Sequence, residues 1–91
     1  MMLSTTEMAR ARETVARILD DIALDAYLFE LEPDDHQWQL TLECAARDGW
    51  SRLSVPLDGS ILAQASEDDA AYQRLLAQCD AALGDCKRSE D

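Results

Sequence analysis

Apolar residues near the start of the chain recur at steps of three and four. Such spacing places them on one stripe of a helix, with charged residues on the opposite side. Ser4 and Glu7 have the S-x-x-E spacing of a capping box, in which the two side chains satisfy free backbone N–H groups. The pattern predicts a helix over about residues 5 to 20. Its apolar stripe consists of Met8, Ala11, Val15, Leu19 and Ile22.

The period then changes to two, which is typical of strands with one buried face. Residues 33–36 form a turn by composition, and residues 47–49 form a second turn in which Gly49 supplies a positive φ. Pro56 cannot donate to a ladder, so the third strand is expected at a sheet edge or to end there. The alternating apolar positions are Tyr27, Phe29 and Leu31, then Trp38, Leu40, Leu42 and Cys44, then Leu53, Val55 and Leu57.

A second helix is expected near the C-terminal end. Ser66 to Asp69 repeats the capping spacing, and Gly84 is the expected C-terminal cap. Residues 59–65 are compatible with a short helical turn. Residues 85–91 are predicted to be a frayed or disordered tail. The apolar stripe of this helix is Tyr72, Leu75, Leu76, Cys79, Ala82 and Leu83.

These elements predict one α+β domain over residues 1–84. Its expected order is helix, three-stranded antiparallel meander and helix (α-β-β-β-α), with both helices packed on one face of the sheet. The second strand would be central. The other face would be polar and would face solvent. It would carry Glu30, Gln39, Thr41, Glu43, Arg52 and Ser54.

Charge narrows the choice of partner. Eight Lys and Arg residues stand against nineteen Asp and Glu residues, which gives a formal charge of −11 over 91 residues. Nucleic acid and anionic membranes are poor partners, because binding them depends on basic side chains. A basic protein surface is the natural complement. The alternative is that the acidity serves only solubility or adaptation to high salt.

The predicted meander gathers acidic residues at one end of the molecule, which we call the acidic pole. They are either solvated loop and helix-start carboxylates or a docking site for a basic partner. Asp34, Asp35 and His36 match neither the EF-hand nor a zinc spacing, so no metal site is predicted. The acidic pole comprises Glu32, Asp34, Asp35, Asp58, Glu67, Asp68 and Asp69.

Two tryptophans have different expected roles. Trp38 belongs to the alternating apolar positions and is expected in the core. Trp50 follows the turn glycine and is either a packed plug of the hairpin or an exposed apolar contact beside Leu28.

Cysteine usage bears on the compartment. Cys44, Cys79 and Cys86 form no C-x-x-C pair, and their odd number leaves at least one thiol over. A reducing cytoplasm is therefore predicted, with Cys79 in the core and Cys86 as an exposed thiol prone to intermolecular disulfide formation. No apolar run is long enough to span a bilayer, and no standard export signal is found.

No catalytic or cofactor motif is present. The lone histidine, His36, lies about 26 Å from Cys44 along an extended strand, too far for a nucleophile and base pair. The spacing of the three glycines matches no phosphate-binding loop motif. We therefore predict no enzymatic activity, no catalytic residue and no cofactor.

Two families share the predicted plan. The element order resembles that of double-stranded-RNA-binding domains, whose last helix begins with basic residues where this chain has Glu67, Asp68 and Asp69. Small size, acidity and helix-plus-meander plan are similar to type III secretion chaperones. The resulting hypothesis is a non-enzymatic protein-binding module, an adaptor or chaperone, compatible with a homodimer. The alternatives are an inhibitor or immunity-type protein that imitates nucleic-acid charge, and an accessory subunit of a larger complex.

Overall fold

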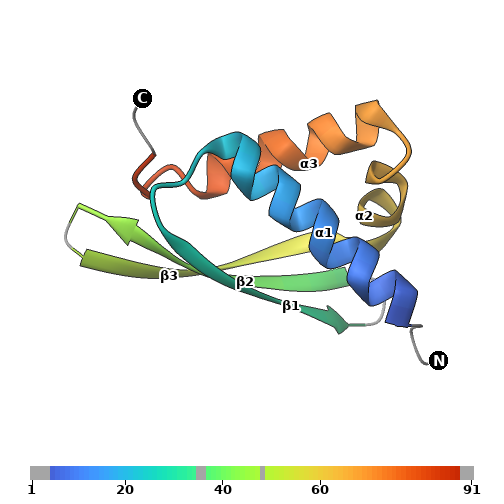
Figure 1. Cartoon of the computed structure of the whole chain (residues 1–91), viewed down its shortest axis with the longest axis horizontal. Coiled ribbons are helices and arrows are strands. Elements are labelled where there is room, and N and C mark those ends of the chain that lie inside the picture. Colours follow the sequence, from blue (N-terminus) through green and yellow to red (C-terminus); the bar gives the residue numbers. More distant parts are fainter. Residues whose placement is uncertain (1–4, 35–36, 48, 89–91) are drawn as a thin grey trace.

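The computed structural model describes residues 5–34, 37–47 and 49–88 (Figure 1). Helix α1 precedes a three-stranded antiparallel sheet, and two further helices follow it. The predicted α-β-β-β-α order is confirmed, and residues 59–65 form a short additional helix. The elements are α1 (Thr5–Ile22), β1 (Tyr27–Asp34), β2 (Gln37–Ala46), β3 (Gly49–Asp58), α2 (Gly59–Ala65) and α3 (Asp69–Ala82).

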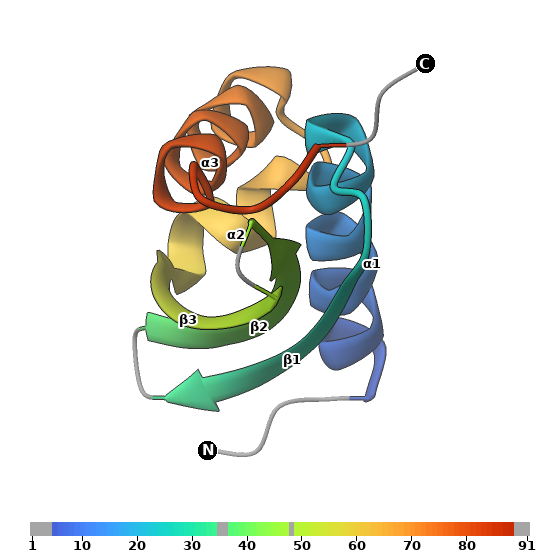
Figure 2. The same ribbon diagram turned by 90° about the vertical axis from the view of Figure 1, so that its left-hand side faces the viewer.

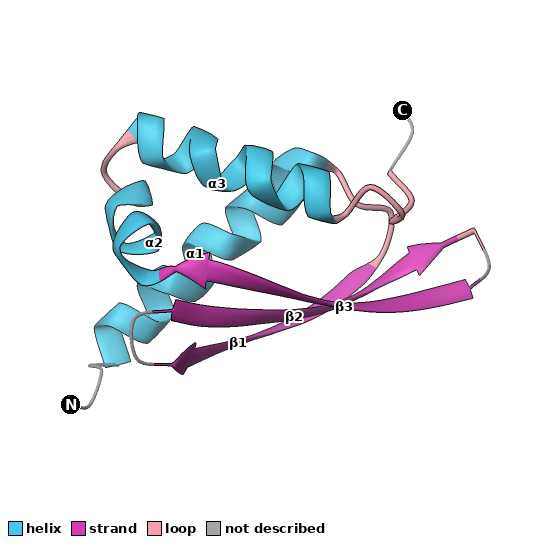
Figure 3. Cartoon of the chain, turned by 180° about the vertical axis from the view of Figure 1, so that it is seen from behind, coloured by secondary structure: helices cyan, strands magenta, loops and turns pink. Residues whose placement is uncertain are grey.

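The helices form one layer and the sheet forms the other. All three helices lie on the same side of the sheet, as Figure 3 shows from behind. Helix α1 lies on the β1 side of this layer and α3 lies on the β3 side (Figure 2). The expected one-sided packing is therefore confirmed, and no described element covers the other face of the sheet.

The register explains where the core lies. The strand order is β1-β2-β3, so the predicted central strand is central and Pro56 lies on an edge strand, as expected. Leu40 stands opposite Leu31 on one side and Val55 on the other, which aligns the apolar positions of three strands on one face. Gly49 has the positive φ that its turn requires, +116°.

The core combines this inner face with the apolar stripes of the helices. Trp38 belongs to it, as predicted. The fully buried large side chains are Val15, Ile18, Leu19, Leu40, Leu42, Leu57, Leu75 and Leu83.

The caps of α3 differ from the prediction. Ser66 is the C-terminal cap of α2, and Asp68 instead accepts a hydrogen bond from the Ala70 N–H at the start of α3, at 3.0 Å. Because α2 continues to Ala65, the next helix begins after the box proposed at Ser66. The residue that caps the end of α3 is Leu83, and Gly84 lacks a left-handed φ. The proposed cap of α1, Ser4, lies outside the described residues.

The expectation of a frayed tail is wrong for residues 85–88. Cys86 is disulfide-bonded to Cys44 and is only 4% exposed, so the predicted exposed thiol is also wrong. The Lys87 N–H donates to the Ala45 carbonyl at 2.7 Å, and the Asp25 N–H donates to the Lys87 carbonyl at 2.9 Å. The C-terminal segment thus pairs with backbone groups at the end of β2 and before β1 that would otherwise lack partners.

Arg88 joins the C-terminal ends of two helices. Its guanidinium donates to the Ile22 carbonyl at the end of α1 and to the Leu83 carbonyl just after α3. It also forms an ion pair with Asp80 at 2.8 Å. Neither helix has a basic residue in its own last turn, so Arg88 supplies positive charge where both helix dipoles favour it.

A polar contact joins α1 and α3 at their facing sides. Tyr72 is a buried residue, and its hydroxyl donates a hydrogen bond to the Asp21 carboxylate. The Arg17 guanidinium lies over the Tyr72 ring, 5.0 Å from its centre. Burial, followed by the hydrogen bond to Asp21, raises the pKa of Tyr72 to about 12.

Cys79 is the remaining free cysteine and is buried in the core, as predicted. Burial raises the pKa of its thiol to about 11, so the thiolate is disfavoured at neutral pH. Among the described helices, none combines the length and apolar character needed to cross a bilayer.

Candidate binding surface

The uncovered side of the sheet, which we call the open face, is built by strand alternation. Residues opposite one another in the register share a face, so each row across the strands can be read directly. The predicted polar positions all fall on this face. From the hairpin end onward the rows are Ala45 and Trp50; Leu28, Glu43 and Arg52; Glu30, Thr41 and Ser54; Glu32, Gln39 and Pro56; Asp34, Gln37 and Asp58.

Trp50 and Leu28 are exposed on this face. Trp50 is 61% exposed and Leu28 is 66% exposed, and they are the large hydrophobic side chains that remain exposed among the described residues. Their positions are two residues apart in register and lie on the two outer strands. The interpretation of Trp50 as a packed plug of the hairpin is therefore wrong. The alternative, an exposed apolar residue on the face that also carries Leu28, is confirmed.

Acidic side chains accompany these two residues. Glu30, Glu32 and Glu43 lie on the open face, and Arg52 is its only cation among the described residues. Arg52 stands directly opposite Glu43, yet no described ion pair joins them. Nearer the middle of the sheet, the Gln39 amide donates to the Ser54 hydroxyl at 2.9 Å and links β2 to β3. The carboxylates therefore face water, and they form no described ion pair or hydrogen bond with other side chains of the sheet.

The structure brings part of the acidic pole together. Asp34 and Asp58 share the last row of the open face, and Glu32 lies in the row before it. Glu67, Asp68 and Asp69 lie at the same end of the molecule, in the turn from α2 to α3 within the helical layer (Figure 1). Asp35 lies outside the described residues.

Two members of the acidic pole have local structural roles. Asp58 caps α2 by accepting from the Ser60 and Ile61 N–H groups at 2.8 and 3.1 Å. Asp68 caps α3. The remaining described members are exposed, and their side chains have no described hydrogen bond or ion pair. The acidic pole is thus partly explained by helix capping, as one of the two interpretations held.

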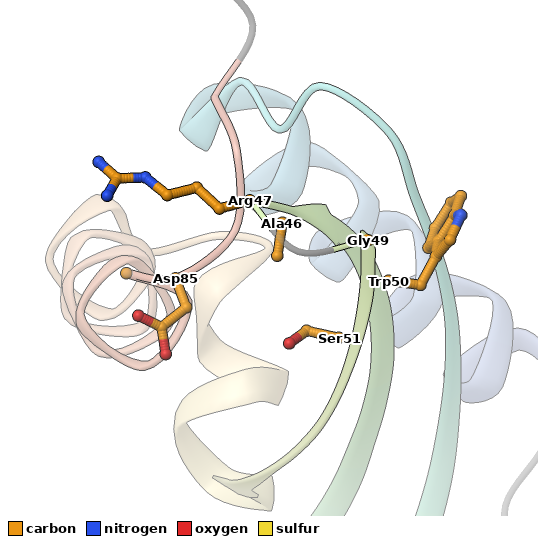
Figure 4. A pocket seen from close by; sticks show the side chains of 7 residues that line it. Ala46, Arg47, Gly49, Trp50, Ser51 and Asp85 are labelled. Atoms are coloured by element: carbon orange, nitrogen blue, oxygen red, sulfur yellow. The ribbon is translucent and has the colours of Figure 1, made fainter.

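A pocket lies at the opposite end, on the inner side of the hairpin. It has a volume of about 580 Å³ and opens between the β2–β3 hairpin and the end of α3. Ser51 points toward this space, whereas Trp50 points away on the other side of β3 (Figure 4). The hairpin extends past the helical layer here (Figure 1). Several of the residues that line the pocket are small. The lining residues are Ala46, Arg47, Gly49, Trp50, Ser51, Gly84 and Asp85.

Sequence reasoning missed this pocket. The signal was the run of small residues at inner positions of the hairpin, namely Ala46, Gly49 and Ser51, where the rest of the sheet carries large apolar side chains. Its charged rim consists of Arg47 and Asp85.

Potential metal ligands do not cluster in the described part of the chain. No group of three or more His, Cys, Asp or Glu side chains there could hold an ion. Asp35 and His36, which the sequence places beside Asp34, lie outside the described residues.

Comparison of the chain with protein-family models, with curated proteins and with solved structures finds no match. The function therefore has to be inferred from the chemistry of the protein's own surface.

Proposed function

We propose that this chain is a small acidic, non-enzymatic protein-binding module, an adaptor or chaperone-like protein, whose partner is basic. The observation that carries the proposal is the exposure of Trp50 and Leu28 on an uncovered sheet face. Aromatic and large aliphatic side chains contribute most to binding when a partner removes them from water. Neither residue contributes to the core, so both side chains are available to a partner.

The charge supports the choice of partner. The formal charge is −11, and the open face repeats this excess of carboxylates over cations. Nucleic acid and anionic membranes would be repelled, whereas a basic protein would be attracted and steered. A homodimer through the open face would bring like charges together, so self-association would have to use another surface, such as the edge of β1.

A second candidate is an acidic inhibitor or immunity-type protein that occupies a basic nucleic-acid groove. The exposed carboxylates of Glu32, Asp34 and Asp58, which share one end of the sheet, favour it. Binding by charge imitation would weaken steeply as ionic strength rises, whereas binding through Trp50 and Leu28 would persist. An accessory subunit of a larger complex would expose the same two apolar residues, and would be recovered together with several other chains.

The compartment is also part of the proposal. A cytoplasmic location stays a prediction, and it rests on the three cysteines being thiols. A disulfide between Cys44 and Cys86 is more typical of chains that mature in oxidising compartments. Alkylation of thiols at the moment of cell lysis, followed by mass measurement, separates the two cases. Cys79 alone would be available for alkylation after denaturation in an oxidising compartment, and all three cysteines in the cytoplasm.

The proposed function is tested by capture of a partner. The immobilised protein is exposed to an extract of the cells that make it, and bound proteins are released first by salt and then by denaturant. A basic protein that is retained until denaturant supports the adaptor or chaperone proposal. Release at moderate salt supports the inhibitor, and an extract from which nothing specific is retained argues against both.

A further inference from the structure

We propose that the open face binds one extended basic segment of another protein, of about eight residues, with a large apolar side chain placed against Trp50 and Leu28. This inference rests on the proposed function and adds the surface, the size and the chemistry of the partner. It follows from the dimensions of the face, from its charge and from the order of its rows.

The dimensions favour a peptide segment over a folded domain. The rows from Trp50 to Asp58 span nine residues of β3, a length of about 26 Å, and three strands give a width of about 10 Å between the outer strands. Each side of a standard protein interface contributes about 800 Å², well above what this face offers. An extended chain of about eight residues has the same length as the face.

The charge on the face favours a basic occupant. Glu30, Glu32 and Glu43 project from it without described ion-pair partners, and Arg52 is the one described cation among them. A second copy of this chain would present the same carboxylates, and like charges face to face are unfavourable. Lysine and arginine side chains from a partner would instead meet carboxylates that the fold leaves unpaired.

The order of the rows places the apolar side chain at one end of the occupant. Trp50 and Leu28 lie at the hairpin end of the face, whereas Asp34 and Asp58 lie at the other end. Ala45, in the same row as Trp50, is small and leaves room beside the indole ring. A segment with its apolar side chain at one end and its basic residues along the rest matches this order, whereas a segment with the apolar side chain at its centre does not.

The probe for the experiment is a synthetic eight-residue peptide, with leucine at one end and lysine at alternate positions among serines. Binding to the whole chain is followed by NMR, through the two tryptophan indole signals and the backbone amides. The two tryptophans provide an internal comparison, because Trp38 is buried and Trp50 is exposed on the open face. A peptide of the same composition with leucine at its centre tests the order of the rows.

Three double variants separate the contributions. Leu28→Ser with Trp50→Ser removes the apolar contact, and Glu30→Gln with Glu43→Gln removes two charges from the open face. Glu13→Gln with Asp20→Asn is the matched control, because it removes two exposed charges from α1 on the other side of the molecule. All these side chains are outside the core, and circular dichroism verifies that each variant is folded.

The expected result is a shift of the Trp50 indole and of open-face amides, without a shift of the Trp38 indole. Affinity should fall about tenfold or more in the apolar variant. The open-face charge variant should lose at least about threefold at low salt, while the control stays within about twofold. The peptide with central leucine should bind more weakly than the peptide with terminal leucine.

Four results would overturn the proposal: no binding at millimolar peptide, shifts confined to the helical layer, shifts confined to the free edge of β1 or β3, or equal losses in the two charge variants. Edge shifts would indicate strand addition and not binding to the face. The experiment distinguishes failure of the proposed binding function from failure of the open face as the binding site. A partner captured equally by wild type and by the apolar variant would keep the binding function and eliminate the open face.

Discussion

Cys86 is disulfide-bonded to Cys44, and this bond joins the C-terminal segment to the central strand of the sheet. The two residues are 42 positions apart, so the cross-link removes much of the freedom of the unfolded chain. Both cysteines are buried against the core. The end of the chain is therefore part of the folded domain as far as Arg88.

Reduction of this disulfide should lower the free energy of unfolding by about 3 to 4 kcal/mol, the loop-closure value for a loop of this length. Urea unfolding with and without a phosphine reductant measures the difference. The double variant Cys44→Ala with Cys86→Ala is the control, and the reductant should not change its stability. Equal stability of the wild type in both conditions would show that the bond does not form in solution.

Replacement of Arg88 by methionine should destabilise the fold by about 1 to 2 kcal/mol, because it removes the cation that bonds the ends of two helices. Urea unfolding provides the measurement. Arg74→Met is the matched control: Arg74 is exposed on α3, has no described hydrogen bond or ion pair, and should change stability by less than about 0.5 kcal/mol. Similar effects of both variants would contradict the role given to Arg88.

Tyr72 should give the fold a specific sensitivity to alkaline pH. Its pKa is raised from 10.0 to about 12 by burial and by Asp21, so the folded state retains a proton that the unfolded chain releases. The corresponding stabilisation is complete below pH 10 and is lost as the pH rises through about 12. Tyr72→Phe should be less stable than wild type by about 1 kcal/mol at neutral pH, because it lacks the hydrogen bond to Asp21.

The measurement is the stability difference between wild type and Tyr72→Phe at several pH values. The difference should become smaller above pH 10 as wild type loses its advantage. A difference that stays constant over this range would show that the folded and unfolded states release the Tyr72 proton at the same pH.

The backbone conformations of Ala23 and Gly84 favour opposite changes, to glycine at the first position and to alanine at the second. Ala23 directly follows α1 and has a left-handed φ of 65°, where glycine avoids the steric penalty of the Cβ atom. Ala23→Gly should therefore stabilise the protein by up to about 1 kcal/mol.

Gly84 provides the reverse case. It has no left-handed φ, and an added Cβ would meet the Ala81 carbonyl oxygen at 3.6 Å, an ordinary contact. Gly84→Ala should be neutral or stabilising by up to about 1 kcal/mol, through the entropy of the unfolded chain. Thermal melts compare both variants with wild type. A loss of stability in Ala23→Gly together with a loss in Gly84→Ala would contradict the assigned backbone conformations.

The elements and the open face could be predicted because each depends on local information. Period-two alternation fixes which residues share a sheet face, and Pro56 marks an edge because proline lacks an N–H. The same rules placed Trp38 in the core and the polar positions on the open face. Capping was less certain, since Ser66 and Asp68 are both good caps and only the length of α2 decides between them.

The features that escaped prediction depend on long-range contacts. Three cysteines allow three pairings, and sequence does not choose among them. The C-terminal segment is polar and short, so its composition indicates a tail. The disulfide to Cys44 and the backbone hydrogen bonds to Ala45 and Asp25 explain why it is held. Arg88 likewise donates to the Ile22 carbonyl, which is 66 positions away in the sequence. The exposure of Trp50 depends on what covers its face of the sheet, which local patterns do not encode.

The central claim is that a partner binds on the open face, and photo-crosslinking in the cells that make the protein tests it most directly. The photoreactive residue benzoylphenylalanine replaces Leu28 in one variant and Glu13, on the exposed side of α1, in the other. The account predicts that a basic protein is crosslinked from position 28 and not from position 13. Absence of an adduct at position 28, or the same adducts from both positions, would contradict it.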